Sequence, residues 1–382
     1  MRLTGVDPGS HVPRPSVPRA GDDKTFNFAF AQRSASVWAC VGDRITFPLD
    51  AEKRERDAVD SYDDARAVAQ RVFLASAYPF VHVQFLETPT LNPVIPIEPT
   101  IFVNPGIYLR HDPAPATASP VLVDVSRSGR EYPPDFRSPL PFTEVHDNVS
   151  MYVEDLCADA PQLGAVLLFA SFPNTYIDTN RHASDIDESL IEGKWPGPIT
   201  QSDFTQRGLG LLKRLSRYGT QMQERKLTVH EVQERLRIYH EPYHLELARV
   251  LAHFRKTFAH AAQLSFHCMS AVGAPTHADP GQQRSDFCIG DVHGKTCTAE
   301  FLELVVGTLR SLGHSVSVNF PYYGGELTRR HSNPTDGINS VFIEINKRMF
   351  IDVKTFKKTE GFAATKASVR ALIQRVVEHS KR

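Results

Sequence analysis

The chain has 382 residues, of which 41% are hydrophobic and 23% are charged, and its formal net charge at pH 7 is −1. This composition is typical of a globular protein with one large domain or two ordinary ones. The balanced charge argues against a nucleic-acid partner, and the apolar runs are too short to span a membrane.

The N-terminal residues 1–23 are rich in Pro, Gly and Ser and lack the apolar segment of a secretory signal. We expect a disordered tail there. The chain contains five cysteines and no CxxC pair, which favours reduced thiols in an intracellular protein. The sequence therefore predicts a cytoplasmic location and leaves organelle targeting open.

Residues 24–110 combine two unlike patterns. Apolar residues at helical spacing predict a helix over 56–76, whereas 82–106 contains too many prolines for a helix or a central strand. We interpret 24–110 as an accessory segment packed on the main domain. The stretch 110–120, which is rich in Pro and Ala, is typical of a linker.

From 118 to 380, strand-like and helix-like patterns alternate. The expected strands cover 121–126, 165–171, 264–270, 314–320 and 340–346. The expected helices cover 148–164, a segment that opens with a capping box at Thr228, 299–313 and 363–379. Gly164 and Gly313 are the expected ends of two of these helices. The alternation predicts one α/β domain whose sheet is covered by helices on both faces.

Residues 240–244 read His-Glu-Pro-Tyr-His and match H-E-x-x-H, the helical pattern of zinc peptidases. Pro242 cannot donate a backbone hydrogen bond, and its ring clashes with the preceding turn, so a kink would misplace the two histidines. A zinc peptidase is therefore the weakest of three functional hypotheses. We interpret Tyr243 as a core residue, and His240 and Glu241 as solvated helix residues.

Longer motifs support a different family. In order and spacing, five stretches between about 120 and 352 resemble the N-formylglutamate amidohydrolase family: FPNTYIDTNR (172–181), PYH (242–244), LSFHCMS (264–270), NFPYYGGELTRRHSNPTDG (319–337) and SVFIEINKRMFID (340–352). The resemblance implies a three-layer sandwich with a mixed central sheet flanked by helices, similar to zinc carboxypeptidases. It also implies hydrolysis of N-formyl-L-glutamate to formate and glutamate, so we expect a small acidic metabolite as the partner.

The resemblance assigns roles to individual residues. Glu344 matches the general base, and Arg181 matches a clamp for an oxyanion or carboxylate, with Asp178 bracing it. The matched substrate-binding positions are Asn180, His244, Gly324, Gly325 and Arg329. The structural alternatives are a salt bridge for Glu344, and a solvated basic pair for Arg329 and Arg330.

The metal-binding part of the resemblance is incomplete. Catalytic zinc uses three protein ligands and an open position, and His267 matches one of these ligands. Arg127 and Val149 stand at the other two positions, where a cation repels the metal and an alkyl group cannot ligate it. Asp147 and His146 lie close along the chain and are weak substitute ligands. We therefore predict that zinc binding is weak or absent.

Two functional hypotheses follow from these assignments. The first is hydrolysis of an N-formyl or N-acyl amino acid, a linear amide, by water that Glu344 activates, with substitute metal ligands or without metal. The second is an inactive, metal-free pseudoenzyme that binds an acidic metabolite or partner. With the metal lost, we expect the Arg127 guanidinium to pair with Glu344 and neutralise it.

Overall fold

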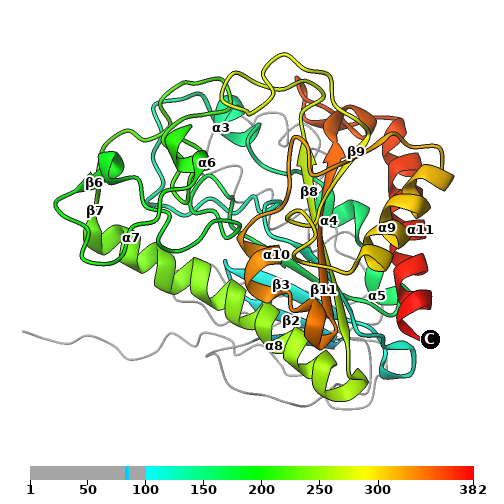
Figure 1. The fold of residues 1–382 in the computed structure, drawn as a ribbon. Coiled ribbons are helices and arrows are strands. Elements are labelled where there is room, and N and C mark those ends of the chain that lie inside the picture. The colour runs from blue at the N-terminus through cyan, green and yellow to red at the C-terminus, as the bar shows by residue number, and fades with distance from the viewer. Residues whose placement is uncertain (1–81, 86–99) are drawn as a thin grey trace, which may run out of the picture. The chain divides into compact units, whose positions relative to one another are not determined.

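The computed structural model describes residues 82–85 and 100–382. Its centre is a nine-stranded mixed sheet (Figure 1). In spatial order the strands are β1 (His82–Phe85), β2 (Thr100–Asn104), β3 (Tyr108–Asp112), β5 (Val166–Ala170), β4 (Val121–Val125), β8 (Ala261–Met269), β11 (Ile338–Asn346), β9 (Phe287–Gly290) and β10 (Val316–Val318).

The middle of the sheet consists of four parallel strands, β5, β4, β8 and β11. On either side, β3 and β9 pair with them in the antiparallel direction. Every residue of β4 and β5 is buried, as expected for strands that are covered on both faces. Because parallel strands end at the same edge of a sheet, the residues that follow these four strands come together there.

Helices cover both faces of the sheet (Figure 1). On one face lie α4 (Val153–Leu156), α5 (Ala160–Leu163), α9 (Ala299–Ser311) and α11 (Gly361–Ser380). On the other face lie α8 (Glu241–Phe258) and α10 (Glu326–His331). Tyr243 of α8 is fully buried, as expected for a core residue. The three-layer α/β architecture with a mixed central sheet is confirmed.

Besides short 3-10 helices at Pro115–Thr117, Glu188–Leu190, Pro334–Asp336 and Lys347–Met349, the described chain contains further short elements. They are the helices α3 (Phe142–His146), α6 (Asp203–Gln206) and α7 (Val229–Arg235), and two small sheets that pair β6 (Ile191–Glu192) with β7 (Leu227–Thr228) and β12 (Ile351–Asp352) with β13 (Lys357–Lys358). Across the described ranges, no helix combines the length and apolar character that a membrane span needs. The four cysteines in these ranges are free thiols.

The region 148–164, expected as one helix, forms two short helices instead. Tyr152 has a left-handed backbone conformation with φ 64°, which a continuous helix does not allow. Pro161 lies in the first turn of α5, where a missing N–H group costs little, although it would disrupt a helix interior. The predicted end at Gly164 is confirmed, because this glycine caps α5 with φ 99°.

The interpretation of 110–120 as a linker is wrong at its start, because Arg110 lies within β3. Its side chain is buried and pairs with Asp112 and with Glu246 of α8. Strand β3 pairs with β5, so the described end of the accessory segment extends the sheet of the domain that was expected to begin at 118. The predicted tail 1–23 and helix 56–76 lie outside the described residues.

The helical segment that contains the His-Glu-Pro-Tyr-His stretch changes geometry at the first residue of that stretch. The capping box at Thr228 is confirmed and opens α7. Residues Leu236–His240 then form a π-helical turn, and α8 begins at Glu241 with Pro242 in its first turn. Pro242 cannot donate a backbone hydrogen bond within a regular helix, and the π turn just before it accommodates this break in the hydrogen-bond pattern. The expectation that His240 is solvated is wrong, because this residue is 2% exposed.

Candidate functional site

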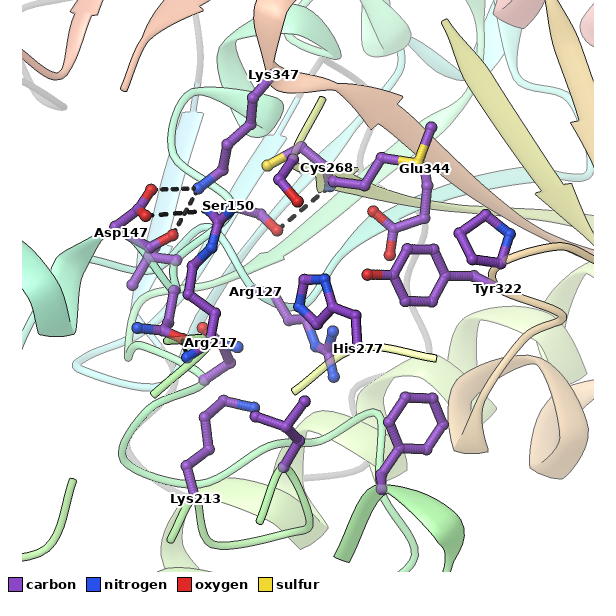
Figure 2. Close-up of a pocket in the computed structure, with 18 of the residues that line it drawn as sticks. Arg127, Asp147, Ser150, Lys213, Arg217, Cys268, His277, Tyr322, Glu344 and Lys347 are labelled. Atoms are coloured by element: carbon purple, nitrogen blue, oxygen red, sulfur yellow. Dashed lines mark hydrogen bonds and ion pairs between the residues drawn. The ribbon is translucent and has the colours of Figure 1, made fainter. Parts of the chain in front are cut away.

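A pocket opens at the edge of the sheet where the four parallel strands end (Figure 2). Its lining includes Arg127 after β4, Asn174 after β5, Cys268 near the end of β8 and Glu344 near the end of β11. The cavity volume is about 90 Å³. Since one water needs a cavity of about 10–15 Å³, the pocket has room for several waters or for a small ligand.

The pocket is strongly cationic. Its lining contains six basic side chains, those of Arg127, Arg181, Arg207, Lys213, Arg217 and Lys347. Against these stand the two carboxyl groups of Asp147 and Glu344. An excess of positive charge in a concave site attracts anions and favours a ligand with acid groups.

Arg127 forms an ion pair at the pocket, and its partner differs from the expected one. The guanidinium donates two hydrogen bonds to Asp178, including one from Nε to Oδ1 at 3.0 Å. Lys213 donates to the same carboxylate at 3.1 Å. Although burial alone raises the pKa of Asp178, Arg127 and Lys213 hold that pKa far below its usual range. The predicted ion pair between Arg127 and Glu344 is therefore wrong.

Glu344 keeps a buried carboxyl group that has no ion pair within the described part of the chain. The residue is 3% exposed, and its Oε2 atom has no hydrogen-bond partner among the described protein atoms. Burial raises the pKa of Glu344 to about 7, although the nearby Arg127 opposes this effect. Figure 2 shows the carboxyl group beside Tyr322. Such a group exchanges a proton near neutral pH, which suits a general base.

Arg181 presents a guanidinium that has no carboxylate partner within residues 100–382. Its Nε donates to the Leu209 carbonyl at 3.2 Å, and its Nη1 donates to the Asn180 carbonyl at 2.9 Å. Its Cζ lies 3.7 Å from the centre of the Phe204 ring, which Arg207 also approaches, at 4.9 Å. Burial lowers the pKa of Arg181 to about 10, so it stays charged near neutral pH. A buried cation held by neutral groups can pair with a ligand carboxylate.

Asp147 lines the pocket but is neutralised by cations of the protein. Lys347 and Arg217 each donate to its carboxylate at 3.1 Å, and the Tyr218 hydroxyl donates at 2.7 Å. Although burial raises the pKa of Asp147, these cations bring it below its usual value. Figure 2 shows the ammonium group of Lys347 beside Asp147. The carboxylate is therefore not free to bind a metal ion.

The remaining side chains do not fit a catalytic zinc ion. Val149 lines the pocket with an alkyl side chain that packs in the apolar core. His146 lies outside the pocket lining, and its Nδ1 bonds to the Tyr132 hydroxyl at 2.9 Å. His267 is buried with an unpartnered Nδ1, but the described residues contain no group of three His, Cys, Asp or Glu side chains that could hold a metal. Zinc needs three such ligands, and Arg127 contributes a cation where the first was expected.

All five positions that the resemblance assigns to substrate binding lie outside the pocket lining. The Asn180 Oδ1 accepts from the Leu327 amide at 3.1 Å, and a Cβ on Gly325 would lie 2.3 Å from this side chain. Gly324 has φ 123°, which favours glycine, and it packs against protein atoms. Arg329 is exposed on α10. Asn180 and the two glycines thus join loops of the protein to one another.

Sequence reasoning missed several basic residues of the pocket. Three of them are Arg207, Lys213 and Arg217. They lie in 200–217, a stretch without a periodic pattern, so no signal marked them. Lys347 could have been found, because it follows Glu344 by three residues inside a matched motif. Of the residues predicted to act on substrate, Arg181 and Glu344 do line the pocket, whereas His244 is buried in α8 and is not part of the lining.

Comparison with known proteins gives consistent matches. The model of the family described as N-formylglutamate amidohydrolase matches residues 119–351. The crystal structure of N-formylglutamate amidohydrolase from Ralstonia eutropha JMP134 is 31% identical, covers 72% of this chain and 99% of that chain, and has a TM-score of 0.67. N-formylglutamate deformylase of Pseudomonas putida is 27% identical over 239 residues, which are 62% of this chain and 81% of that protein. The Pseudomonas aeruginosa deformylase is 26% identical over 225 residues, 56% and 76% of the two chains.

Proposed function

Because this chain belongs to the N-formylglutamate amidohydrolase family, we propose that its pocket binds N-formylglutamate or a related N-acyl acidic amino acid, as a metal-free binding protein. The observation that carries the proposal is the charge of the lining, which contains six basic side chains. Asp178 and Asp147 pair with four of them, and Arg181 and Arg207 have no ion pair among the described residues. The carboxylates of such a ligand offer partners for these two cations. The ion pair of Arg127 with Asp178 supports the metal-free part, because it keeps a cation at the position of an implied zinc ligand.

We expect the purified protein to carry well under one equivalent of zinc and to release no formate from N-formyl-L-glutamate, with or without added zinc. The reason is the loss of two of three implied ligands at Arg127 and Val149. Elemental analysis and a formate assay measure the two quantities. Stoichiometric zinc that disappears in His267→Ala would contradict the metal-free proposal.

Binding of N-formyl-L-glutamate is expected to strengthen as the pH falls from about 8 to about 6. The pKa of Glu344 is raised to about 7, so its carboxyl group becomes neutral in this range and stops repelling the ligand. The ligand's own carboxylates have pKa values of about 4 and stay charged between pH 6 and pH 8. The gain is at most about tenfold per pH unit. Calorimetric titration at each pH gives the dissociation constant.

The control for this pH dependence is Glu344→Gln, which keeps the shape of the side chain and removes its titration. We expect a nearly flat profile over the same range in this variant. Lys213 also titrates close by, because burial lowers its pKa to about 8. An unchanged slope in Glu344→Gln would assign the effect to Lys213 or another group and contradict the role of Glu344.

A second candidate function is metal-free hydrolysis, which the unpartnered Oε2 of Glu344 favours. Ionised Glu344 would take a proton from water while the water oxygen bonds to the formyl carbon. The resulting oxyanion would lie near the guanidinium groups of Arg127 and Arg181. Glu344 would then give its proton to the amide nitrogen as the C–N bond breaks, releasing formate and glutamate. Formate release that is lost in Glu344→Gln would favour this function over binding alone.

A further inference from the structure

His240 and His244, the pair that the zinc-peptidase pattern singles out, contact the turn that carries Arg181. The two imidazoles stand one turn apart, where the π turn meets α8, and their ring centres are 4.5 Å apart. The Nε2 atom of His244 lies 2.8 Å from the carbonyl oxygen of Thr179. The Nε2 atom of His240 lies 2.9 Å from the carbonyl oxygen of Arg181. Both rings are buried, so neither bond competes with bulk water.

The protonation of these histidines follows from their partners. A carbonyl oxygen can only accept, so both Nε2 atoms carry hydrogens and donate. Burial lowers the pKa of His240 to about 4 and that of His244 well below its usual value, so both rings are neutral. The Nδ1 of His244 therefore accepts, and Nε2 of His331 on α10 donates to it at 2.8 Å. The two helices thus hold the 178–181 turn by a directional chain of hydrogen bonds.

The same turn sets the position of the Arg181 guanidinium. Its Nη1 donates to the carbonyl of Asn180, which lies between the two carbonyls that the histidines bind. The turn is closed by a hydrogen bond from the Arg181 amide to the Asp178 carbonyl at 3.0 Å. A shift of the turn would therefore move the guanidinium relative to the Phe204 ring and the pocket.

We propose that His240 and His244 are positioning residues for ligand binding, which hold the 178–181 turn and thereby aim Arg181 into the pocket. The inference rests on the proposed function, because it takes Arg181 as a partner of the ligand's acid group. It gives the His-Glu-Pro-Tyr-His stretch a role without metal. The histidines donate hydrogen bonds to backbone carbonyls. Because the two residues are one helical turn apart, both imidazoles face the same backbone segment, residues 178–181.

The test is a double-mutant cycle between His244 and Arg181, with the dissociation constant of N-formyl-L-glutamate as the readout. His244→Met removes the donor, and we expect binding to weaken about tenfold, the effect of roughly one lost hydrogen bond. His244→Gln keeps a donor near the position of Nε2 and is expected to bind within about twofold of the wild type. In the Arg181→Met background, His244→Met should change binding no further.

The outcomes separate the two proposals. An equal loss from His244→Met in both backgrounds, or no loss in either, overturns the positioning role. An Arg181→Met variant that binds as tightly as the wild type overturns the proposed function itself. The matched control is His314→Met, which removes another histidine whose Nε2 makes one hydrogen bond, to Ser368 at 2.8 Å, and which should leave binding unchanged.

A second measurement needs no ligand. Hydrogen exchange of the Arg181 amide reports the closing bond of the turn directly. We expect faster exchange in His240→Met and His244→Met, and wild-type exchange in the two corresponding glutamine variants. Unchanged protection in both methionine variants overturns the positioning role, whether or not the probe binds.

Discussion

Replacement of Asp178 by asparagine is expected to lower the free energy of unfolding by about 3–5 kcal/mol. Asp178 is fully buried, and its carboxylate pairs with both Arg127 and Lys213. Asparagine has nearly the same shape but no charge, so the variant leaves two cations in the protein interior without their counter-charge. Urea unfolding of the wild type and the variant measures the difference.

The difference in unfolding free energy between the wild type and Asp178→Asn should depend on pH. The pKa of Asp178 is depressed in the folded protein, so its contribution is present above the unfolded pKa of about 4 and is lost as the pH falls below that value. The gap between wild type and Asp178→Asn should therefore shrink below about pH 4. The control is Asp336→Asn, which removes an exposed pair with Arg255 and should change the stability little, because solvent screens that pair. Equal losses in the two variants would contradict the account.

A milder pair of variants keeps the prediction testable if Asp178→Asn does not fold. Arg127→Met removes one cation and leaves Asp178 paired with Lys213. The double variant Asp178→Asn, Arg127→Met should be more stable than Asp178→Asn alone, because it leaves one cation of the cluster unpaired instead of two. A double variant that is no more stable than Asp178→Asn, or that also fails to fold, would contradict the account.

Elements that bury a continuous apolar run could be predicted from the sequence. Strands β4 and β11 and helix α9 lie where their patterns placed them, because burial on the sheet or on one helix face dictates those patterns. Strands β2 and β3 could not be predicted, since they lie next to prolines and form by pairing, β3 with β5 and β2 with β3. No local signal marks the left-handed Tyr152 that divides 148–164.

The sequence motifs predicted residues of the pocket better than they predicted the ion-pair partners of those residues. Arg127 was expected to pair with Glu344, yet it pairs with Asp178. This choice depends on Lys213, which completes the charge cluster and lies in 200–217, whose path no periodicity predicts. An ion pair is set by where distant loops meet. The sequence therefore identified Arg127, Arg181 and Glu344 as residues of one site, while the other lining residues and the partner of each side chain required the structure.

The variant Arg181→Met is expected to weaken binding of N-formyl-L-glutamate by about 30-fold or more, because removing one partner of a buried charge pair costs about 2–5 kcal/mol. Arg181 lines the pocket, has neutral partners at Leu209 and Asn180, and lacks a carboxylate partner among the described residues. Methionine keeps much of the length and the contact with Phe204. Calorimetric titration measures the loss, and thermal unfolding checks that the variant is folded.

The matched comparison is Arg329→Met, since the family resemblance assigns a substrate carboxylate to Arg329 while its position on α10 is exposed and outside the pocket lining. The structure therefore predicts at most a small change for Arg329→Met. If this variant weakens binding and Arg181→Met does not, the ligand carboxylate lies over α10, near the Tyr323 ring that Arg329 approaches at 5.4 Å. That outcome would place the binding site over α10 instead of in the cationic pocket. It would also remove the reason to connect His240 and His244 to ligand binding.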